Sequence, residues 1–278
     1  MTEIRPTVLP FQTASRAWSH RLFATVLVAL LAASAPRAAE SPDQRALASQ
    51  LAGAEFGPKT QALSTVARMA PETVGPELRA VLIAELEREA QLVTSRYWAP
   101  RRNLPLAPLD DPEYIVKLAE VVAMLKDPQA IPALAHALGL GFVAITPLVE
   151  FGEPAVPAVL DVALSLDSSV YAVNDALIAL RMMVERQRDR PLSPGTLAAI
   201  RDAARLHLIV KQPFFETTMW AIDLAVALDD PTLRRIVQAI AANPAEARAR
   251  GALEPEDVLL VQTRANERLS GVPPIAQP

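Results

Sequence analysis

A short unit that occurs twice constrains the fold of this chain more than any other feature. Leu125–Leu138 reads LKDPQAIPALAHAL, and Phe151–Leu164 reads FGEPAVPAVLDVAL. In both copies an acidic residue precedes a proline, and a Pro-Ala pair two or three residues later opens a run of apolar side chains. Proline is favoured in the first turn of a helix, where its missing N–H costs little. This acid-proline unit therefore predicts the start of a helix that the chain repeats.

Similar boundaries occur elsewhere in the chain. The tetrapeptide Leu-Asp-Asp-Pro stands at 109–112 and again at 228–231, and Lys126-Asp127-Pro128 is closely related to it. In each case the aspartate before proline can accept hydrogen bonds from the free N–H groups of a helix's first turn. We therefore interpret these paired carboxylates as helix caps, in preference to a metal site or an acid–base pair.

Apolar side chains between these boundaries recur at the spacing of a helix. They fall at i, i+3 and i+4 in 78–93, 115–125 and 233–241, as expected for amphipathic helices with one face to bury. Aromatic residues make up only 5% of the chain and there are 9 glycines, a composition that favours helices over sheets. We expect an all-α fold, an α-solenoid of stacked antiparallel helix pairs.

The repeated segments also resemble a known family. The runs LKDPQAIPALAHALG, LVEFGEPAVPAVLDVAL and LDSSVYAVNDALIALRMM are similar to HEAT repeats, of the short kind also found in phycobilisome-lyase-like proteins. The matching positions are Asp127, Pro128, Ile131–Leu134, Leu138, Phe151–Pro154, Asp167, Val170, Ala172, Ala176 and Leu177. The resemblance implies a HEAT-like or armadillo-like superhelix with a protein-binding surface and no particular chemistry. Pro128 and Pro154 are only 26 residues apart, however, which is short for a repeat of about 40 residues.

The N-terminus has the pattern of an export signal. Arg16, His20 and Arg21 precede an uncharged run over 22–36, which suits the apolar core of a signal peptide better than a membrane span. We predict a signal peptide or a retained signal-anchor over 1–39, a linker over 40–57, a HEAT-like repeat domain over 58–270 and a flexible tail over 271–278. The expected location is periplasmic or secreted, with membrane anchoring facing the periplasm as the alternative.

Charge and cysteine content exclude several classes of protein. Residues 1–39 hold four of the 27 basic residues and one of the 31 acidic ones, so the remainder has a net charge of about −7. Binding to nucleic acid generally needs a basic surface, and we therefore expect no nucleic-acid partner. The chain has no cysteine, which excludes disulfides, thiolate metal sites and a lipid-modified cysteine anchor.

Candidate catalytic groups are few. Outside 1–39 the only histidines are His136, expected to be a solvated helix residue, and His207, expected to be a structural imidazole nearer the apolar face. HExxH, GxSxG, GxGxxG and P-loop motifs are all absent. We predict no catalytic residues, no metal and no cofactor.

The segment 95–112, SRYWAPRRNLPLAPLDDP, is the strongest candidate for a binding site. It concentrates charge and aromatic area in Arg96, Tyr97, Trp98, Arg101 and Arg102, the residue types that dominate binding hot spots. The alternative is a long connector packed on the edge of the solenoid. The aromatic residues of 211–220 stand at helical spacing and are expected to lie in the core.

These features together predict a non-enzymatic, exported interaction scaffold that binds a protein or peptide on the solenoid surface. One alternative is a membrane-tethered scaffold with an uncleaved N-terminal anchor. The other is a small-molecule enzyme with an unrecognised site.

Overall fold

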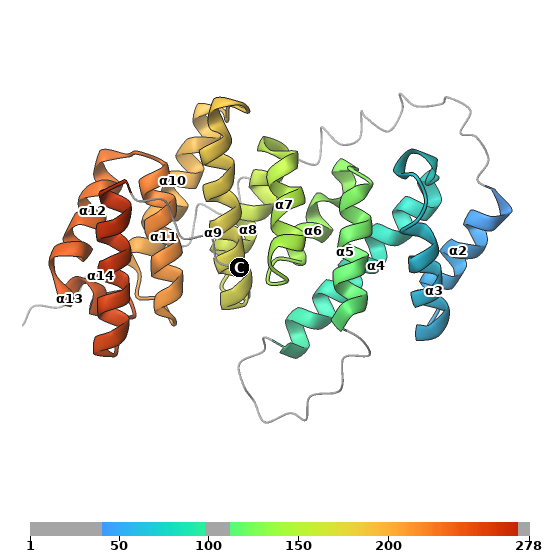
Figure 1. Ribbon diagram of the computed structural model, residues 1–278, viewed down its shortest axis with the longest axis horizontal. Helices are drawn as coiled ribbons and strands as arrows, with labels where there is room; N and C mark the ends of the chain where they lie inside the picture. The colour runs from blue at the N-terminus through green and yellow to red at the C-terminus, as the bar shows by residue number, and fades with distance from the viewer. Residues whose placement is uncertain (1–40, 98–111, 272–278) are drawn as a thin grey trace, which may run out of the picture. The chain divides into compact units, whose positions relative to one another are not determined.

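The computed structural model describes residues 41–97 and 112–271, with side chains placed except at 93–97 and 112 (Figure 1). Thirteen α-helices and no strand occur in these two ranges, which confirms the predicted all-α class. The predicted signal segment 1–39 and residues 272–278 of the predicted tail lie outside the described residues.

Four short 3₁₀ turns accompany the α-helices. The α-helices are α2 (Pro42–Ala52), α3 (Phe56–Val66), α4 (Pro76–Tyr97), α5 (Pro112–Met124), α6 (Ile131–His136), α7 (Phe142–Phe151), α8 (Val156–Leu164), α9 (Val170–Glu185), α10 (Pro194–Ile209), α11 (Phe215–Ala227), α12 (Pro231–Ala242), α13 (Pro244–Ala249) and α14 (Pro255–Leu269). The 3₁₀ turns are η1 (Pro71–Thr73), η2 (Pro128–Ala130), η3 (Glu153–Ala155) and η4 (Arg186–Arg188).

Helices two apart in the chain pack against one another. Along one series α2 contacts α4, α4 contacts α6, α6 contacts α8, and α8 contacts α10. Along the other, α3 contacts α5, α5 contacts α7, α7 contacts α9, and α9 contacts α11, which packs on α14. Most consecutive helices also touch, so the hydrophobic faces of both series meet in one continuous core.

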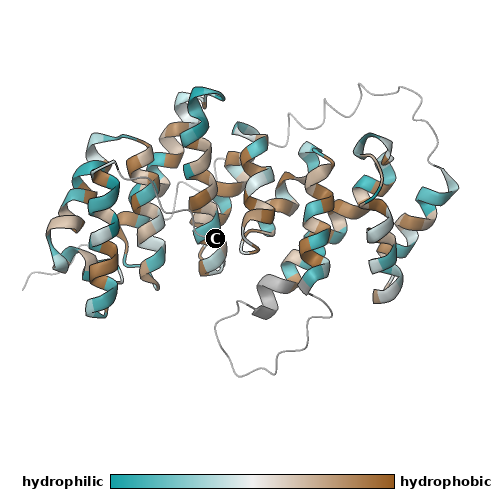
Figure 2. Cartoon of the chain, in the orientation of Figure 1, coloured by the Kyte–Doolittle hydropathy of each residue, from teal (hydrophilic) through white to brown (hydrophobic). Residues whose placement is uncertain are grey.

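The predicted apolar stripes form this core. On α4 the side chains of Leu78, Leu82 and Leu86 are fully buried, and so are those of Leu118 and Val122 on α5. Figure 2 shows the corresponding alternation of hydrophobic and hydrophilic residues around each helix. Burial of such stripes supplies most of the stability of helices this short.

The two acid-proline units share one local structure. In the first, Pro128 opens the 3₁₀ turn η2 and the second proline, Pro132, stands in the first turn of α6. In the second, Pro154 lies in η3 and Pro157 in the first turn of α8. The predicted repeated helix start is therefore confirmed, and the first proline of each unit lies in a tighter turn that leads into the α-helix.

The predicted caps are present at two described boundaries. Asp127 accepts a hydrogen bond from the Gln129 amide at 2.9 Å, and Asp230 accepts from the amides of Thr232 and Leu233 at 2.8 and 3.1 Å. The pKa of Asp230 is lowered, chiefly by the Leu233 hydrogen bond, as expected for a carboxylate that caps a helix. Asp110 and Asp111 lie outside the described residues.

The predicted linker over 40–57 is wrong in its described part, because α2 occupies most of it. Ser41 caps this helix by accepting a hydrogen bond from the Gln44 amide at 3.3 Å, and Pro42 stands in its first turn. Ala48 and Leu51 are buried against the core. The apolar face of α2 is only a few residues long. Its mostly polar composition therefore suggested a linker, although this helix packs on α3 and α4.

Candidate functional site

The sequence-predicted binding segment falls largely beyond what the structure describes. Arg96 and Tyr97 are in the last turn of α4, with main chain but not side chains placed. Trp98, Arg101 and Arg102 lie outside the described residues. That binding prediction therefore stays a prediction.

The candidate histidines His136 and His207 lie in different environments, one exposed and one buried. His136 is exposed, as predicted, but its Nδ1 lies 2.5 Å from Oε1 of Glu87, a contact that sequence spacing could not show. His207 is buried, and its Nε2 lies 2.8 Å from the carbonyl oxygen of Ala163. Burial lowers the pKa of His207, so a neutral ring links α10 to α8. This agrees with the predicted structural role.

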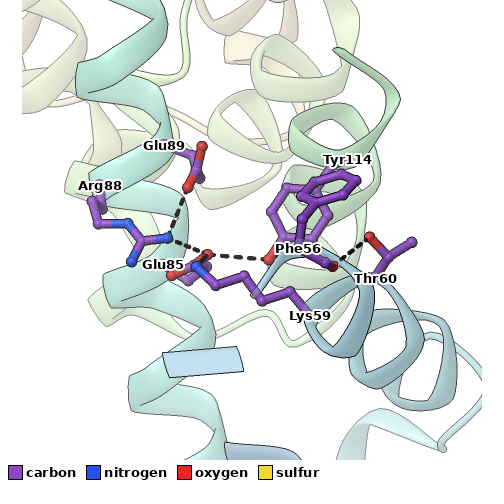
Figure 3. A network of polar contacts seen from close by, with 7 residues as sticks. All are labelled: Phe56, Lys59, Thr60, Glu85, Arg88, Glu89 and Tyr114. Carbon is purple, nitrogen blue, oxygen red and sulfur yellow. Dashed lines mark hydrogen bonds and ion pairs between the residues drawn. The ribbon is translucent and has the colours of Figure 1, made fainter. Parts of the chain in front are cut away.

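A buried polar cluster around Glu85 joins α3, α4 and α5 (Figure 3). Glu85 Oε1 accepts from Lys59 Nζ at 2.8 Å, from Arg88 Nη2 at 2.6 Å and from the Tyr114 hydroxyl at 3.1 Å. The Tyr114 ring also packs edge-on against Phe56, with 5.4 Å between the ring centroids. Burial first, and then the nearby Glu85 charge, raise the pKa of Tyr114, which keeps its hydroxyl protonated as a donor. This cluster, the Glu85 node, holds helices together.

A second buried carboxylate, Asp223 of α11, gathers three arginines from α9 and α14. Arg264 holds it with two hydrogen bonds, of 2.8 and 2.6 Å to the two carboxylate oxygens. Arg181 Nη1 lies 3.3 Å and Arg268 Nε 3.4 Å from the same carboxylate. The Arg264 guanidinium also stands 5.9 Å from the centre of the Trp220 ring, at cation–π range. This cluster, the Asp223 node, is also a link between helices.

The predicted aromatic core segment is only partly buried. Phe215, Met219 and Trp220 pack against the core, as expected. Phe214 precedes the first turn of α11 and its side chain is about half exposed. The helix begins one residue later than the spacing of the aromatic residues suggests, so Phe214 belongs to the preceding loop.

A groove of about 1260 Å³ lies over α6 and α8 and the turns that precede them. Its apolar lining comes from Pro128, Ile131, Pro132, Ala135, Pro154, Pro157, Ala158, Val162, Leu166 and Ala172. Its polar lining comes from Gln91, His136, Asp161, Ser165, Asp167, Ser168 and Ser169. We name this feature the α6/α8 groove.

The two acid-proline units build the wall of this groove. All four of their prolines line it, and α6 and α8 pack against one another. A proline ring is rigid and its nitrogen carries no proton, so the wall is apolar and has few donors to satisfy. The repetition that predicted a helix start thus also creates a continuous surface.

The charged groups of the groove are acidic. Asp161 and Asp167 are both exposed, and its lining contains no lysine or arginine. At one end, Glu87 accepts a hydrogen bond from Gln91 at 2.8 Å and contacts His136 through the same oxygen. The lining therefore combines an apolar wall with carboxylates at its margin.

The groove does not combine its polar groups into a catalytic arrangement. The Ser165 hydroxyl oxygen accepts from the Asp167 amide at 3.1 Å, and that of Ser169 caps α9 by accepting from the Ala172 amide at 3.1 Å. These oxygens stabilise a turn and a helix start, and the ring of His136 contacts Glu87 instead of a serine. Within the two described ranges, no group of three or more histidine and carboxylate side chains is placed to hold a metal ion.

Sequence reasoning did not identify this groove, although its components were visible. Asp167 and the prolines were read as parts of a repeat, and the side of each helix that faces solvent was not assigned. The groove could have been inferred from the position of the four prolines, because all of them precede or open α6 and α8, which belong to the same series of packed helices.

Comparisons with protein-family models, with curated proteins and with solved structures give no match. In the part of the chain that the structure describes, no single helix is long and apolar enough to cross a membrane. Only the pair Phe142–Phe151 and Glu153–Leu164, bent by 120° at the break between them, meets those criteria of length and composition together.

Proposed function

We propose that this chain is a HEAT-like α-solenoid that acts as a non-enzymatic, exported scaffold, and that it binds an extended segment of a partner protein in the α6/α8 groove. The observation that carries the proposal is the groove itself, which the two acid-proline units build from neighbouring helices. The packing of helices two apart in the chain supports a stacked arrangement.

The shape and chemistry of the groove favour a peptide segment over a small metabolite. Its volume exceeds the roughly 300–1,000 Å³ typical of small-molecule pockets. Exposed proline rings offer flat apolar contact, and Gln91 and Ser168 add polar groups at the margins that can bond to a peptide main chain. Leu166 at the edge is fully exposed and adds apolar surface to the groove.

The exported location is proposed from the sequence of residues 1–39, in which basic residues precede an uncharged run. A retained anchor would leave the same groove on a membrane-tethered protein. Cell fractionation separates the two, because a tethered chain sediments with membranes at its full mass.

Site-specific photocrosslinking in the native cell tests the binding proposal. A benzophenone amino acid replaces Pro132, exposed in the groove, and in a matched control it replaces Thr146, exposed on α7 outside the groove. We expect a discrete adduct from position 132 that is absent from position 146 and is lost when Ala158→Trp fills the groove. Equal adducts at both positions, or none at 132, would overturn the proposal.

A further inference from the structure

The charge distribution of the α6/α8 groove points to the chemistry of its occupant. We infer that the groove selects extended peptide segments of net positive charge, in which arginine or lysine alternates with proline or aliphatic residues. This inference rests on the proposed function, since it names the class of segment that the groove would bind.

The first argument is charge complementarity. Asp161 and Asp167 are exposed at the margin, no ion pair joins either of them to a described cation, and neither lysine nor arginine lines the groove. Complementary charge raises association rates and excludes partners of the same sign as the site. An acidic segment would bring its charges against two carboxylates and meet no compensating cation.

The second argument is the layout of apolar and charged groups. The prolines of the acid-proline units form an apolar wall, and Asp161 follows them one turn along α8 from Pro157. Arginine and lysine have long methylene stems that lie on apolar surface while the charged head reaches outward. A basic side chain can therefore cover a proline ring and place its head near a carboxylate, which a short polar side chain cannot do.

Glu87, an acidic residue near one end of the groove, is already engaged. Glu87 Oε1 accepts from Gln91 and contacts His136, so its charge is shared at that end. The two free carboxylates are on the α8 side, and the charge preference should depend on Asp161 and Asp167 in particular.

A random-peptide display library selected on the full-length chain tests the inference. Peptides that also bind the groove-filling variants Ala158→Trp or Ser165→Trp are discarded, so the survivors report the groove alone. Two variants are used because Ala158 packs partly on the core whereas Ser165 is exposed, and circular dichroism checks that each is folded. We expect surviving peptides to carry more lysine and arginine than aspartate and glutamate.

The charge dependence is then measured by fluorescence anisotropy on one selected peptide. Asp161→Asn with Asp167→Asn should weaken binding by about threefold to tenfold, because each exposed pair contributes modestly. The matched control, Asp189→Asn with Asp202→Asn, removes the same charge from exposed sites outside the groove and should change binding by less than about twofold.

The outcomes separate the inference from the function beneath it. Groove-dependent peptides that are neutral or acidic, or that bind the Asp161→Asn/Asp167→Asn variant unchanged, overturn the charge preference and leave the binding function in place. If no peptide depends on an unfilled groove, both are overturned.

Discussion

The Glu85 node and the Asp223 node each bury a carboxylate, but different side chains hold it. Each buries a carboxylate completely or nearly so, with 4% of Glu85 and 0% of Asp223 exposed. Glu85 is held by one buried lysine, one tyrosine hydroxyl and Arg88, whose side chain is 45% exposed. Asp223 is held by three arginines whose side chains are each at most 12% exposed.

This difference determines which cations keep a partner when the buried carboxylate of each node is removed. A lysine is a compact point charge, and Arg88 also bonds to Glu89 at 2.8 Å, so it retains a partner if Glu85 changes. The arginines of the Asp223 node come from α9 and α14, which both pack on α11, and all three contact Asp223, while Arg181 and Arg268 also lie 3.7 Å from Glu185. Losing Asp223 would leave the buried Arg264 without its carboxylate, and Arg181 and Arg268 with only the exposed Glu185 at 3.7 Å. Losing Glu85 would strand Lys59 alone.

The largest effect is therefore expected at Asp223. Asp223→Asn should lower the free energy of unfolding by about 4–5 kcal/mol, because breaking a buried ion pair leaves uncompensated charge. Urea denaturation followed by circular dichroism measures the loss. Glu216→Gln, an exposed carboxylate near the start of the same helix, is the control and should change stability by less than about 0.5 kcal/mol. A similar small effect for both would show that the three arginines do not depend on Asp223.

The corresponding change at the other node should cost less. Glu85→Gln is expected to lower the free energy of unfolding by about 3 kcal/mol, since Lys59 is left buried while Arg88 turns to Glu89 and to solvent. The same denaturation experiment compares the two nodes directly. A loss equal to or greater than that of Asp223→Asn would contradict the ranking.

A double substitution isolates the stranded charge. Lys59→Met with Glu85→Gln removes both members of the buried pair and should recover most of the stability lost by Glu85→Gln alone, because apolar replacements of buried pairs are often neutral. If the double variant is less stable than Glu85→Gln, the stranded lysine is not the cause of the loss.

A smaller effect is expected from the neutral donor of the Glu85 node. Tyr114→Phe keeps the ring that packs on Phe56 but removes the hydroxyl that donates to Glu85, so it should cost about 1 kcal/mol. In the Glu85→Gln background the cost should shrink, because the hydroxyl no longer meets a charged acceptor. Equal costs in the two backgrounds, measured as a double-mutant cycle, would show that the hydroxyl and Glu85 act independently.

Local features of this fold were predictable from the sequence, and the nodes were not. Asp127 and Asp230 cap helices as predicted, because a cap depends on a few adjacent residues. Lys59 and Glu85 are 26 residues apart, and Asp223 and Arg264 are 41 apart. On its own helix each of these charges looks like part of a solvated face. Only the packing of separate helices shows that they are buried together.

The α6/α8 groove, too, could be predicted only in its local features and not in its contacts between helices. The prolines of the acid-proline units predicted where α6 and α8 begin, since their effect on the backbone is local. That Pro132 and Pro157 are both exposed in one groove depends on how α6 packs on α8, a contact between separate helices. Asp161 could be assigned to a helix, but not to the margin of a groove.

The smallest effect is predicted for a backbone turn that occurs twice, at Lys126 before η2 and at Asp229 before α12. Lys126 and Asp229 each stand before a capping aspartate, and both have φ of +50°, in the left-handed region. Aspartate tolerates this conformation better than lysine does, because its short polar side chain can bond locally, and glycine adopts it with no penalty. Lys126→Gly should therefore raise the free energy of unfolding by about 0.5 kcal/mol, a gain partly offset by the flexibility of glycine in the unfolded chain.

Asp229→Gly should give no gain, or a small loss, because it relieves less strain and removes the 3.3 Å contact with Arg234. Thermal denaturation of the two variants side by side measures the difference, with Lys126→Ala as the control that removes the lysine side chain but keeps the Cβ. A gain for Lys126→Ala equal to that for Lys126→Gly would place the cost in the side chain and not in the backbone. Equal gains at both positions would mean that aspartate is strained as much as lysine in this turn, and that the two copies differ only in their surroundings.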